Sequence, residues 1–317
     1  MRILVTGAAG YLGGKLARGL CEEDWVERVV GLDLSAPAWR HPKFSFHAQD
    51  VRAPLMDLLK AEEVDTVAHL AYVLPPMHDK NYMEEVNKGG TLNVLAAARA
   101  AHVRHILYTS STTAYGFWPD NHVPLTEDSP LRGNDDFTYA KNKKEIETIL
   151  EAFRRDNPQI TLAILRPCFV VGPGFQNPLA RHLQKRLVML PAGAQPFQFV
   201  HEDDLQEVML RFLKDGRGGV YNVAAPGVLT FREMVRMLGN LHLALPWPLI
   251  YGLTAVAWDL RLRFLTEFPS PALRLMVHPW IASAEKLVRD TGFSFLYDTR
   301  ESFADFVRHV RGGGAAD

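Results

Sequence analysis

The start of the chain constrains the fold most, because a short apolar run leads through a glycine turn into a helix-length segment. Ile3-Leu4-Val5-Thr6 is followed by Gly7-Ala8-Ala9-Gly10-Tyr11-Leu12-Gly13. Glycines at these spacings allow a tight turn, a close approach of the backbone to a pyrophosphate, and close packing of a helix on a strand. The free N–H groups of the helix start bind the anion. This order predicts a dinucleotide-binding strand–turn–helix unit.

An acidic residue follows at the spacing that such a unit needs. The second predicted strand ends at Gly31-Leu32-Asp33, and Asp33 stands 20 residues beyond Gly13. A carboxylate there accepts hydrogen bonds from the adenosine ribose hydroxyls and repels a 2′-phosphate. A lone glycine pattern or a lone loop carboxylate would be weak evidence, but here strand, turn, helix and acid coincide. The sequence therefore predicts NAD rather than NADP.

Apolar runs alternate with amphipathic segments through the first two thirds of the chain, which is typical of a parallel sheet wrapped by helices. The pattern predicts an α/β fold, a Rossmann doubly wound parallel sheet. The predicted strands are 2–6, 28–32, 43–47, 66–69, 105–108 and 161–165, and the predicted helices are 11–20, 54–59, 81–101 and 137–155.

The regular alternation of apolar runs and amphipathic segments ends after Pro167, where turns and shorter elements begin. We expect residues 1–170 to form the NAD-binding Rossmann domain, with later segments near 195–225 returning to it, including strands at 198–201 and 219–223. Residues 171–311 are expected to form a smaller C-terminal substrate-binding α/β region, and 312–317 a disordered tail. Asp203 or Asp204 suits the N-cap of a helix at 205–214. The longest apolar stretch, 243–260, contains two prolines and predicts a packed helix that lines a pocket rather than a membrane span.

Composition limits the partners and the compartment. The 317 residues carry a formal net charge of −1, so no overall field attracts nucleic acid or an anionic membrane surface. The two cysteines, Cys21 and Cys168, form no Cys-x-x-Cys pair and predict reduced, buried thiols in a cytoplasmic protein. The first residues run straight into a strand, which argues against a signal peptide. His201 and the three acids after it supply too few ligands from one helix start, so no metal site is predicted.

Three side chains with acid–base chemistry follow the dinucleotide motif. Tyr139 and Lys143 stand four residues apart at a predicted helix start and so share one face. A tyrosine has an ordinary pKa of about 10, and a nearby ammonium favours its phenolate. Ser111 follows a strand end, where ligands of parallel sheets bind. The pattern predicts that Ser111 holds an oxygen that Tyr139 protonates or deprotonates.

These motifs together resemble the extended short-chain dehydrogenase/reductase superfamily, in particular the NAD-dependent epimerase/dehydratase family that includes UDP-galactose 4-epimerase. The resemblance covers nearly the whole chain and is densest over residues 1–210. Further segments that carry it are Asp50-Val51, His69-Leu70-Ala71, Val86-Asn87-Lys88-Gly89-Gly90-Thr91, Glu127-Asp128-Ser129-Pro130, Arg166-Pro167, Gly172-Pro173 and Val200-His201-Glu202-Asp203-Asp204.

The resemblance implies site roles and a mechanism. Tyr139 removes a proton from a secondary alcohol while hydride passes to the nicotinamide, Ser111 steadies the oxygen, and Lys143 holds the nicotinamide ribose. It implies a small-molecule substrate and a homodimer in which the helices 81–101 and 137–155 pair with their mates. The implied cofactor-binding residues are Gly7, Gly10, Tyr11, Leu12, Gly13, Asp33, Asp50, Val51, Leu70, Ala71, Asn87, Thr109, Tyr139, Lys143, Pro167 and Phe169.

Departures from the family pattern bear on the substrate. Thr112 and Thr113 stand where dehydratases of the family carry an Asp-Glu pair, which disfavours dehydration. Phe197 stands where sugar-nucleotide members place an arginine that grips the diphosphate.

Three hypotheses stay open. The first is oxidation or epimerisation of a secondary alcohol, including that of a sugar nucleotide. The second is a dehydrogenase or reductase of an apolar carbonyl compound that resembles 3β-hydroxysteroid dehydrogenases. The third is a non-catalytic NAD(H)-sensing regulator, which the presence of Ser111, Tyr139 and Lys143 disfavours, since non-catalytic relatives commonly lose the tyrosine.

Overall fold

A seven-stranded parallel sheet forms the centre of the molecule in the computed structural model, which describes residues 1–74 and 76–312. Its strands are β1 (Arg2–Thr6), β2 (Arg28–Asp33), β3 (Phe44–Ala48), β4 (Thr66–His69), β5 (His105–Thr109), β6 (Thr161–Pro167) and β10 (Gly219–Val223). They lie in the order β3-β2-β1-β4-β5-β6-β10. The chain runs outward from β1 to β3 and then crosses back to β4, so the predicted Rossmann sheet is confirmed, with its reversal point between β1 and β4.

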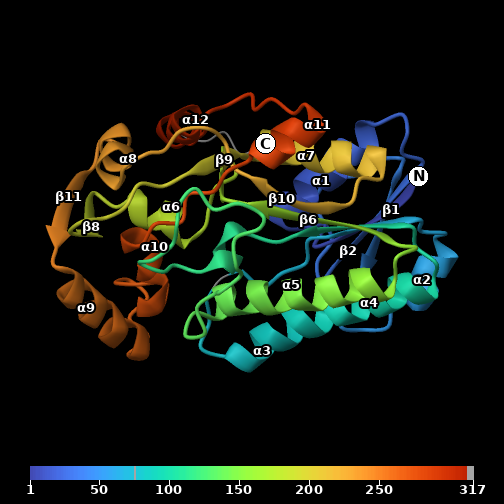
Figure 1. Cartoon of the computed structure of the whole chain (residues 1–317), viewed down its shortest axis with the longest axis horizontal. Coiled ribbons are helices and arrows are strands. Elements are labelled where there is room, and N and C mark those ends of the chain that lie inside the picture. The colour runs from blue at the N-terminus through green and yellow to red at the C-terminus, as the bar shows by residue number, and fades with distance from the viewer. Residues whose placement is uncertain (75, 313–317) are drawn as a thin grey trace.

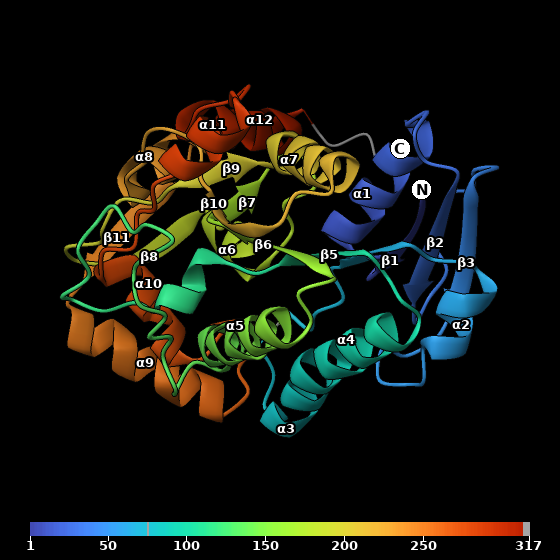
Figure 2. The ribbon, with the colours of Figure 1, turned by 45° about the vertical axis from the view of Figure 1, so that its right-hand side comes forward.

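Helices cover both faces of this sheet. The helices α1 (Tyr11–Glu22) and α7 (Glu202–Asp215) lie on one face, and α2 (Met56–Ala61), α4 (Gly90–Ala100) and α5 (Thr138–Asp156) lie on the other (Figure 2). Side chains of β1 alternate between the two layers: Ile3 and Val5 pack toward α1, whereas Leu4 packs with the α2 and α4 residues. A sheet buried on both faces explains why the strands read as almost continuous apolar runs.

The predicted helix 81–101 is a continuous helical run with a wider turn inside it. It comprises α3 (Lys80–Glu84), a π-helical turn η1 (Glu85–Gly89) and α4. The π turn carries Asn87, whose side chain is fully buried. Such a turn is commonly found at functional sites.

Smaller elements make up the remainder of the chain. Two parallel strand pairs occur among them, β7 (Phe169–Val171) with β9 (Phe199–His201) and β8 (Leu187–Pro191) with β11 (Leu241–Leu245). The helices are α6 (Pro178–Leu183), α8 (Phe231–Met237), α9 (Trp247–Asp259), α10 (Arg274–Val277), α11 (Glu285–Thr291) and α12 (Thr299–Arg311). The end of the molecule opposite β1 to β3 holds β8, β11, α8, α9 and α10, whereas α11 lies beside α7 (Figure 1).

The start of α7 differs from the sequence prediction. His201 is the N-cap, and its Nδ1 accepts a hydrogen bond of 3.1 Å from the Asp203 N–H. Asp204 is instead fully buried, and its carboxylate accepts the N–H groups of Leu296 and Tyr297 at 2.8 and 3.2 Å. The carboxylate therefore holds a distant loop, which a local capping pattern could not reveal. The predicted disordered tail lies outside the described residues from 313 on.

The long apolar stretch 243–260 forms the end of β11 and then the predicted helix, and no residue of this helix lines either of the two cavities described below. Within α9 only Ile250 and Ala257 are buried. Apolar side chains occur all around this helix, and the core beside it covers only one side. In the described part of the chain, no helix has the length and apolar character needed to cross a bilayer.

Candidate active site

A cavity of about 1120 Å³ opens where the carboxyl ends of the sheet strands face the C-terminal elements. Ligands of open α/β sheets bind in this crevice. All the predicted catalytic residues line the cavity, and so do all the predicted cofactor-binding residues except Asn87. Predicted residues at or after the ends of six different strands therefore lie together at one site.

The glycine turn leaves no room for side chains. Gly7 has a φ of +73°, and a Cβ atom there would lie 2.9 Å from the Ala71 backbone nitrogen. A Cβ atom on Gly13 would lie 2.0 Å from the Gly7 carbonyl oxygen. Only glycine at both positions lets β1, α1 and the segment after β4 approach this closely, and the cradle that results fits a dinucleotide pyrophosphate.

Two carboxylates mark the other end of this cradle. Asp33 lies at the end of β2, and its Oδ2 accepts the Ala9 N–H at 3.0 Å. Asp50 is paired with Arg52 at 2.7 Å, a hydrogen bond that lowers the pKa of the Asp50 carboxyl. Asp33 is thus held against the glycine turn with part of its surface open to the cavity, as a ribose-binding carboxylate requires.

A contact that the sequence did not reveal ties the glycine turn to the start of α7. The Tyr11 hydroxyl donates to the buried Glu202 carboxylate, which also accepts the Gly174 N–H at 3.0 Å and the Lys15 ammonium at 3.1 Å. Burial next to this carboxylate raises the pKa of Tyr11. Glu202 thereby joins the cofactor cradle to segments of the C-terminal region.

The predicted acid–base residues meet at the centre of the cavity. Ser111 is the N-cap of the 3₁₀ turn η2 (Thr112–Tyr115), and Tyr139 stands in the first turn of α5. Burial raises the pKa of Tyr139, and the nearby hydroxyls of Ser111 and Thr113 act in the opposite direction. The Thr113 hydroxyl is buried without a hydrogen-bond partner among the described residues. Sequence reasoning used Thr113 only to argue against dehydration and missed its place beside Tyr139.

Lys143 does not lower the pKa of Tyr139 in this structure, contrary to the sequence prediction. Burial lowers the pKa of Lys143 to about 7, so much of the amine is neutral near neutral pH. Its Nζ donates to the Thr109 carbonyl at 2.9 Å and lies 3.9 Å from the Tyr72 ring centroid but 5.9 Å from that of Tyr139. Burial therefore dominates the pKa of the tyrosine.

Two buried polar residues shape the floor of the site. Asn87 does not line the cavity; its Oδ1 accepts the Val73 N–H at 2.7 Å and so fixes the segment after β4. His69 lies between the hydroxyls of Thr6 and Thr91 at 2.7 and 3.0 Å, as expected for a histidine satisfied within the fold. Burial lowers the pKa of His69 to about 3, so the ring is neutral.

The opposite wall of the cavity is apolar and, apart from Phe169, which was predicted to bind the cofactor, comes from segments that carried no motif. Phe169, Phe268, Met276 and Trp280 line it, together with Leu179, Leu273 and Leu275. Phe197 does not line the cavity; it is fully buried behind this wall, 5.4 Å from Phe169 and 5.2 Å from Trp280 between ring centroids. Both cysteines are buried free thiols, as predicted, and burial raises the pKa of Cys168 on this wall.

Arg181 is the only lysine or arginine among the described residues on this side of the cavity, and Glu267 holds it at 2.8 Å. No group of three metal-ligating side chains occurs in the part of the chain that the structure describes. His201, considered as a ligand in the sequence, instead bonds Asp305 through Nε2 at 3.2 Å.

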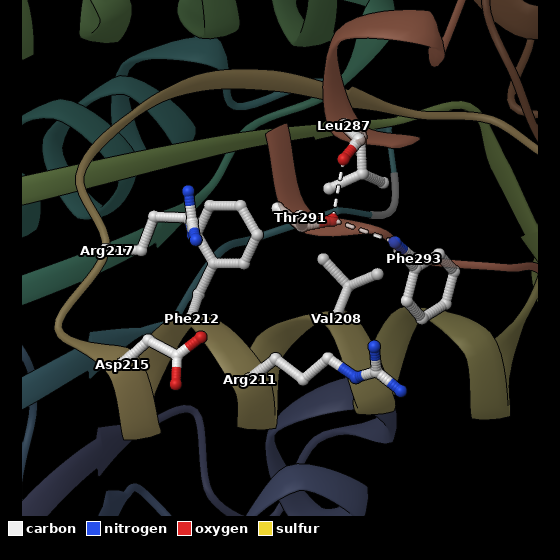
Figure 3. Close-up of a pocket in the computed structure, with 8 residues that line it drawn as sticks. All are labelled: Val208, Arg211, Phe212, Asp215, Arg217, Leu287, Thr291 and Phe293. Carbon is white, nitrogen blue, oxygen red and sulfur yellow. Dashed lines mark hydrogen bonds between the residues drawn. The ribbon is translucent and has the colours of Figure 1, made fainter. Parts of the chain in front are cut away.

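A second hollow, between α7 and α11, is too small to be the dinucleotide site (Figure 3). Its volume is about 90 Å³, and no predicted site residue lines it. The Thr291 hydroxyl at its edge is satisfied, since it donates to the Leu287 carbonyl at 2.6 Å and accepts the Phe293 N–H at 3.2 Å. The large cavity is therefore the candidate active site.

Comparisons with known proteins agree with this assignment. A family model described as the NAD dependent epimerase/dehydratase family matches residues 3–224. An uncharacterized protein of Mycobacterium tuberculosis is 28% identical over 315 residues, which cover 96% of this chain and 83% of that protein. UDP-glucuronic acid decarboxylase 6 of Arabidopsis thaliana is 30% identical over 265 residues, 76% of this chain and 74% of that protein.

Solved structures show the same fold. The UDP-glucose 4-epimerase of Thermotoga maritima, solved with UDP-glucose, has a TM-score of 0.78 at 19% identity and covers 99% of both chains. The Bordetella bronchiseptica enzyme WbmG, solved with NAD, has a TM-score of 0.78 at 20% identity and covers 100% of this chain and 96% of that one. The family description names NAD, which confirms the predicted cofactor at the level of the family. The chain belongs to the NAD dependent epimerase/dehydratase family.

Proposed function

We propose that this chain oxidises a secondary alcohol, or reduces the corresponding ketone, on a substrate that is largely apolar. The observation that carries the proposal is the composition of the cavity. Its cradle end offers glycines and carboxylates, whereas the wall beyond Tyr139 offers Phe169, Phe268, Met276 and Trp280. Apolar and aromatic walls with a few convergent polar groups are typical of sites for weakly polar small molecules.

Gly7, Gly10 and Gly13 would hold the pyrophosphate of NAD, Asp33 the adenosine ribose, and Lys143 the nicotinamide ribose. NAD, when bound there, supplies the acceptor for the hydride of the alcohol carbon, and its reduced form supplies the donor for the reverse reaction. The residues of the chain manage the proton that accompanies this transfer.

Tyr139 is the proposed proton donor and acceptor. Its raised pKa keeps the phenol protonated at neutral pH, which suits protonation of a ketone oxygen. Ser111 and Thr113 lie beside it and would hold the substrate oxygen at hydrogen-bond distance. In alcohol oxidation Tyr139 must first lose its proton, so we expect oxidation to speed up with rising pH.

The residues around Tyr139 do not favour elimination of water. The carboxylates that line the cavity within the described residues are Asp33 and Asp50, and both lie at the cradle end. Dehydration needs a further acid and base next to the reacting carbon. Thr112 and Thr113 supply neither, so a dehydratase reaction is not proposed.

Sugar-nucleotide epimerisation is the second candidate. The names of the solved relatives favour it, and Arg181 could hold a diphosphate if it released Glu267. Phe197 on the core side of the apolar wall disfavours it, because no cation replaces the family arginine there. A sensor that only binds NAD(H) has least support, since Ser111, Tyr139 and Lys143 all lie in the cavity.

The roles can be tested by turnover. Ligands released from the purified protein would be identified by mass spectrometry, and NAD reduction measured with secondary alcohols that range from apolar polycyclic compounds to UDP-sugars. We expect turnover of an apolar alcohol and a loss of roughly 10²- to 10⁴-fold in kcat for Tyr139→Phe. Tyr251→Phe on α9 is the matched control. Turnover of UDP-sugars alone would favour the second candidate, and turnover that survives in Tyr139→Phe would remove the assigned role.

We also propose that residues 1–170, with segments near 195–225, act as the cofactor domain and that the enzyme is cytoplasmic. We further propose that the chain forms a homodimer through α4 and α5. Leu92, half-exposed on α4, would be covered in such a dimer. Light scattering at micromolar concentration tests the assembly, and a monomer there would contradict it.

A further inference from the structure

The outer side of α9 carries an apolar stripe that none of the described residues covers. Leu249, Leu253, Val256 and Leu260 recur at intervals of four, three and four residues and so lie on one side of the helix. Val256 is 58% exposed and Leu260 64% exposed. Solitary exposed leucines are ordinary on protein surfaces, but a contiguous stripe marks an interaction site.

The stripe continues beyond the helix. Phe264, in the turn that follows α9, is 75% exposed, and Leu265 next to it is also exposed. The helix packs against β8, and on β8 and β11 the register partners Leu187 and Leu241 are exposed as well. These elements form the end of the molecule opposite β1 to β3 (Figures 1 and 2). We call Leu249, Leu253, Val256, Leu260, Phe264 and Leu265 the α9 face.

The segments that form and adjoin the α9 face contain more cations than carboxylates. The segments 178–191 and 247–268 contain five lysines and arginines but only two acids, Asp259 and Glu267, in a chain whose net charge is −1. Arg261, Arg263 and Arg186 are exposed and have no salt bridge within the described residues. The pKa of Glu267 is lowered first by its hydrogen bond to Arg181 and then by the charges of Lys185 and Arg263, so several cations gather around one carboxylate.

The α9 face also adjoins the mouth of the candidate active site. The helix packs against the 3₁₀ turn η3 (Ser270–Leu273), whose Leu273 lines the cavity. On its other side Trp258 stacks on His78 at 4.3 Å between ring centroids, close in sequence to Leu74 and Pro76 of the cavity lining. An occupant of the α9 face would therefore lie beside the entrance to the apolar wall.

We propose that the α9 face docks on the surface of an anionic lipid bilayer. Exposed leucines and a phenylalanine flanked by arginines and lysine match an interface of acyl chains and anionic headgroups. A second copy of the chain fits less well, because a two-fold contact through this face would bring Arg261, Arg263 and their mates together. The low net charge of the whole chain does not reveal this local excess of lysines and arginines over acidic residues. The proposal concerns peripheral docking and does not depend on the substrate.

Vesicle flotation of the full-length protein tests the proposal. We expect binding to vesicles of phosphatidylcholine mixed with phosphatidylglycerol, weaker binding to phosphatidylcholine alone, and release by salt. Val256→Gln/Leu260→Gln should lower binding by roughly hundredfold, because two apolar side chains no longer enter the bilayer. Val288→Gln/Leu296→Gln, which alters exposed residues on and after α11, is the matched control and should bind as the wild type does.

A second variant keeps the test decisive if the first does not fold. Arg261→Gln/Arg263→Gln should lower binding to anionic vesicles by about thirtyfold and weaken its salt dependence. Unchanged thermal unfolding midpoints would show that the variants are folded. Absence of binding to both vesicle types, or equal binding to both, would overturn the proposal. So would an oligomer in solution that Val256→Gln/Leu260→Gln converts to monomers, because the face would then join copies of the chain.

Discussion

The two halves of the candidate active site are built in different ways. The cofactor half consists of backbone turns at strand ends, where Gly7 and Gly13 leave less than 3 Å for an added Cβ atom. The substrate half consists of side chains such as Phe169, Phe268 and Trp280, which come from segments about a hundred residues apart. A position where two backbone segments approach this closely accepts only glycine, whereas a position in an apolar wall accepts many residue types. The first half should therefore be fragile to substitution and the second adjustable.

Gly13→Val is the sharpest way to break the cofactor half. A Cβ atom at this position would lie 2.0 Å from the Gly7 carbonyl oxygen, so the turn must open. We expect NAD affinity to fall by more than about a hundredfold and the free energy of unfolding to fall by about 3 kcal/mol. Calorimetry and urea unfolding measure the two quantities. Gly252→Ala, where no atom lies within 4 Å, is the control, and retention of NAD binding by Gly13→Val would refute the close-approach argument.

The same contrast explains how much the sequence could predict. The strands of the parallel sheet, the glycine turn, Asp33 and the triad of Ser111, Tyr139 and Lys143 followed from local spacing, because motif and geometry coincide there. Apart from Phe169, which was predicted to bind the cofactor, the residues of the apolar wall did not, since they have no common pattern.

Where an outcome depended on tertiary packing, local reasoning failed. The outward side of α9 depends on how little core lies beside the helix, and the role of Asp204 depends on a loop about ninety residues further on. The pKa of Tyr139 is raised because burial is the largest influence on it, and a local sequence pattern does not report burial.

Asp33→Ser tests the cofactor half at its other end. The carboxylate lies against the glycine turn, where it would accept hydrogen bonds from the ribose hydroxyls and repel a 2′-phosphate. We expect the ratio of NAD to NADP affinity to fall by about a hundredfold. Binding titrations with both cofactors measure it, and Asp50→Ser should leave the ratio nearly unchanged. A wild type that prefers NADP would contradict the role of Asp33.

Lys143→Met tests the junction of the two halves of the site, where we expect the buried amine that serves the reaction to lower the stability of the fold. The Lys143 pKa is depressed from 10.5 to about 7, so the unfolded chain binds more protons than the folded one between these values. The buried Lys143 therefore lowers the free energy of unfolding of the wild type in full below pH 7, and this destabilisation decreases as pH rises toward 10.5. We expect the variant to gain about 2 kcal/mol in the free energy of unfolding at neutral pH and to lose turnover. A gain that does not shrink in alkaline urea titrations would count against a buried amine.

Phe268→Ala should have the smallest effect, because it alters one side chain of an adjustable wall. Phe268 is half-buried and packs on the His182 ring at 6.2 Å between centroids, so the wall loses contact area without losing its backbone. We expect KM for an apolar alcohol to rise about fivefold, with kcat and NAD affinity nearly unchanged. Phe264→Ala, which truncates an exposed phenylalanine four residues earlier, serves as the matched control in the same steady-state assay. If Phe268→Ala weakened NAD binding instead, the two halves of the site would not be separable.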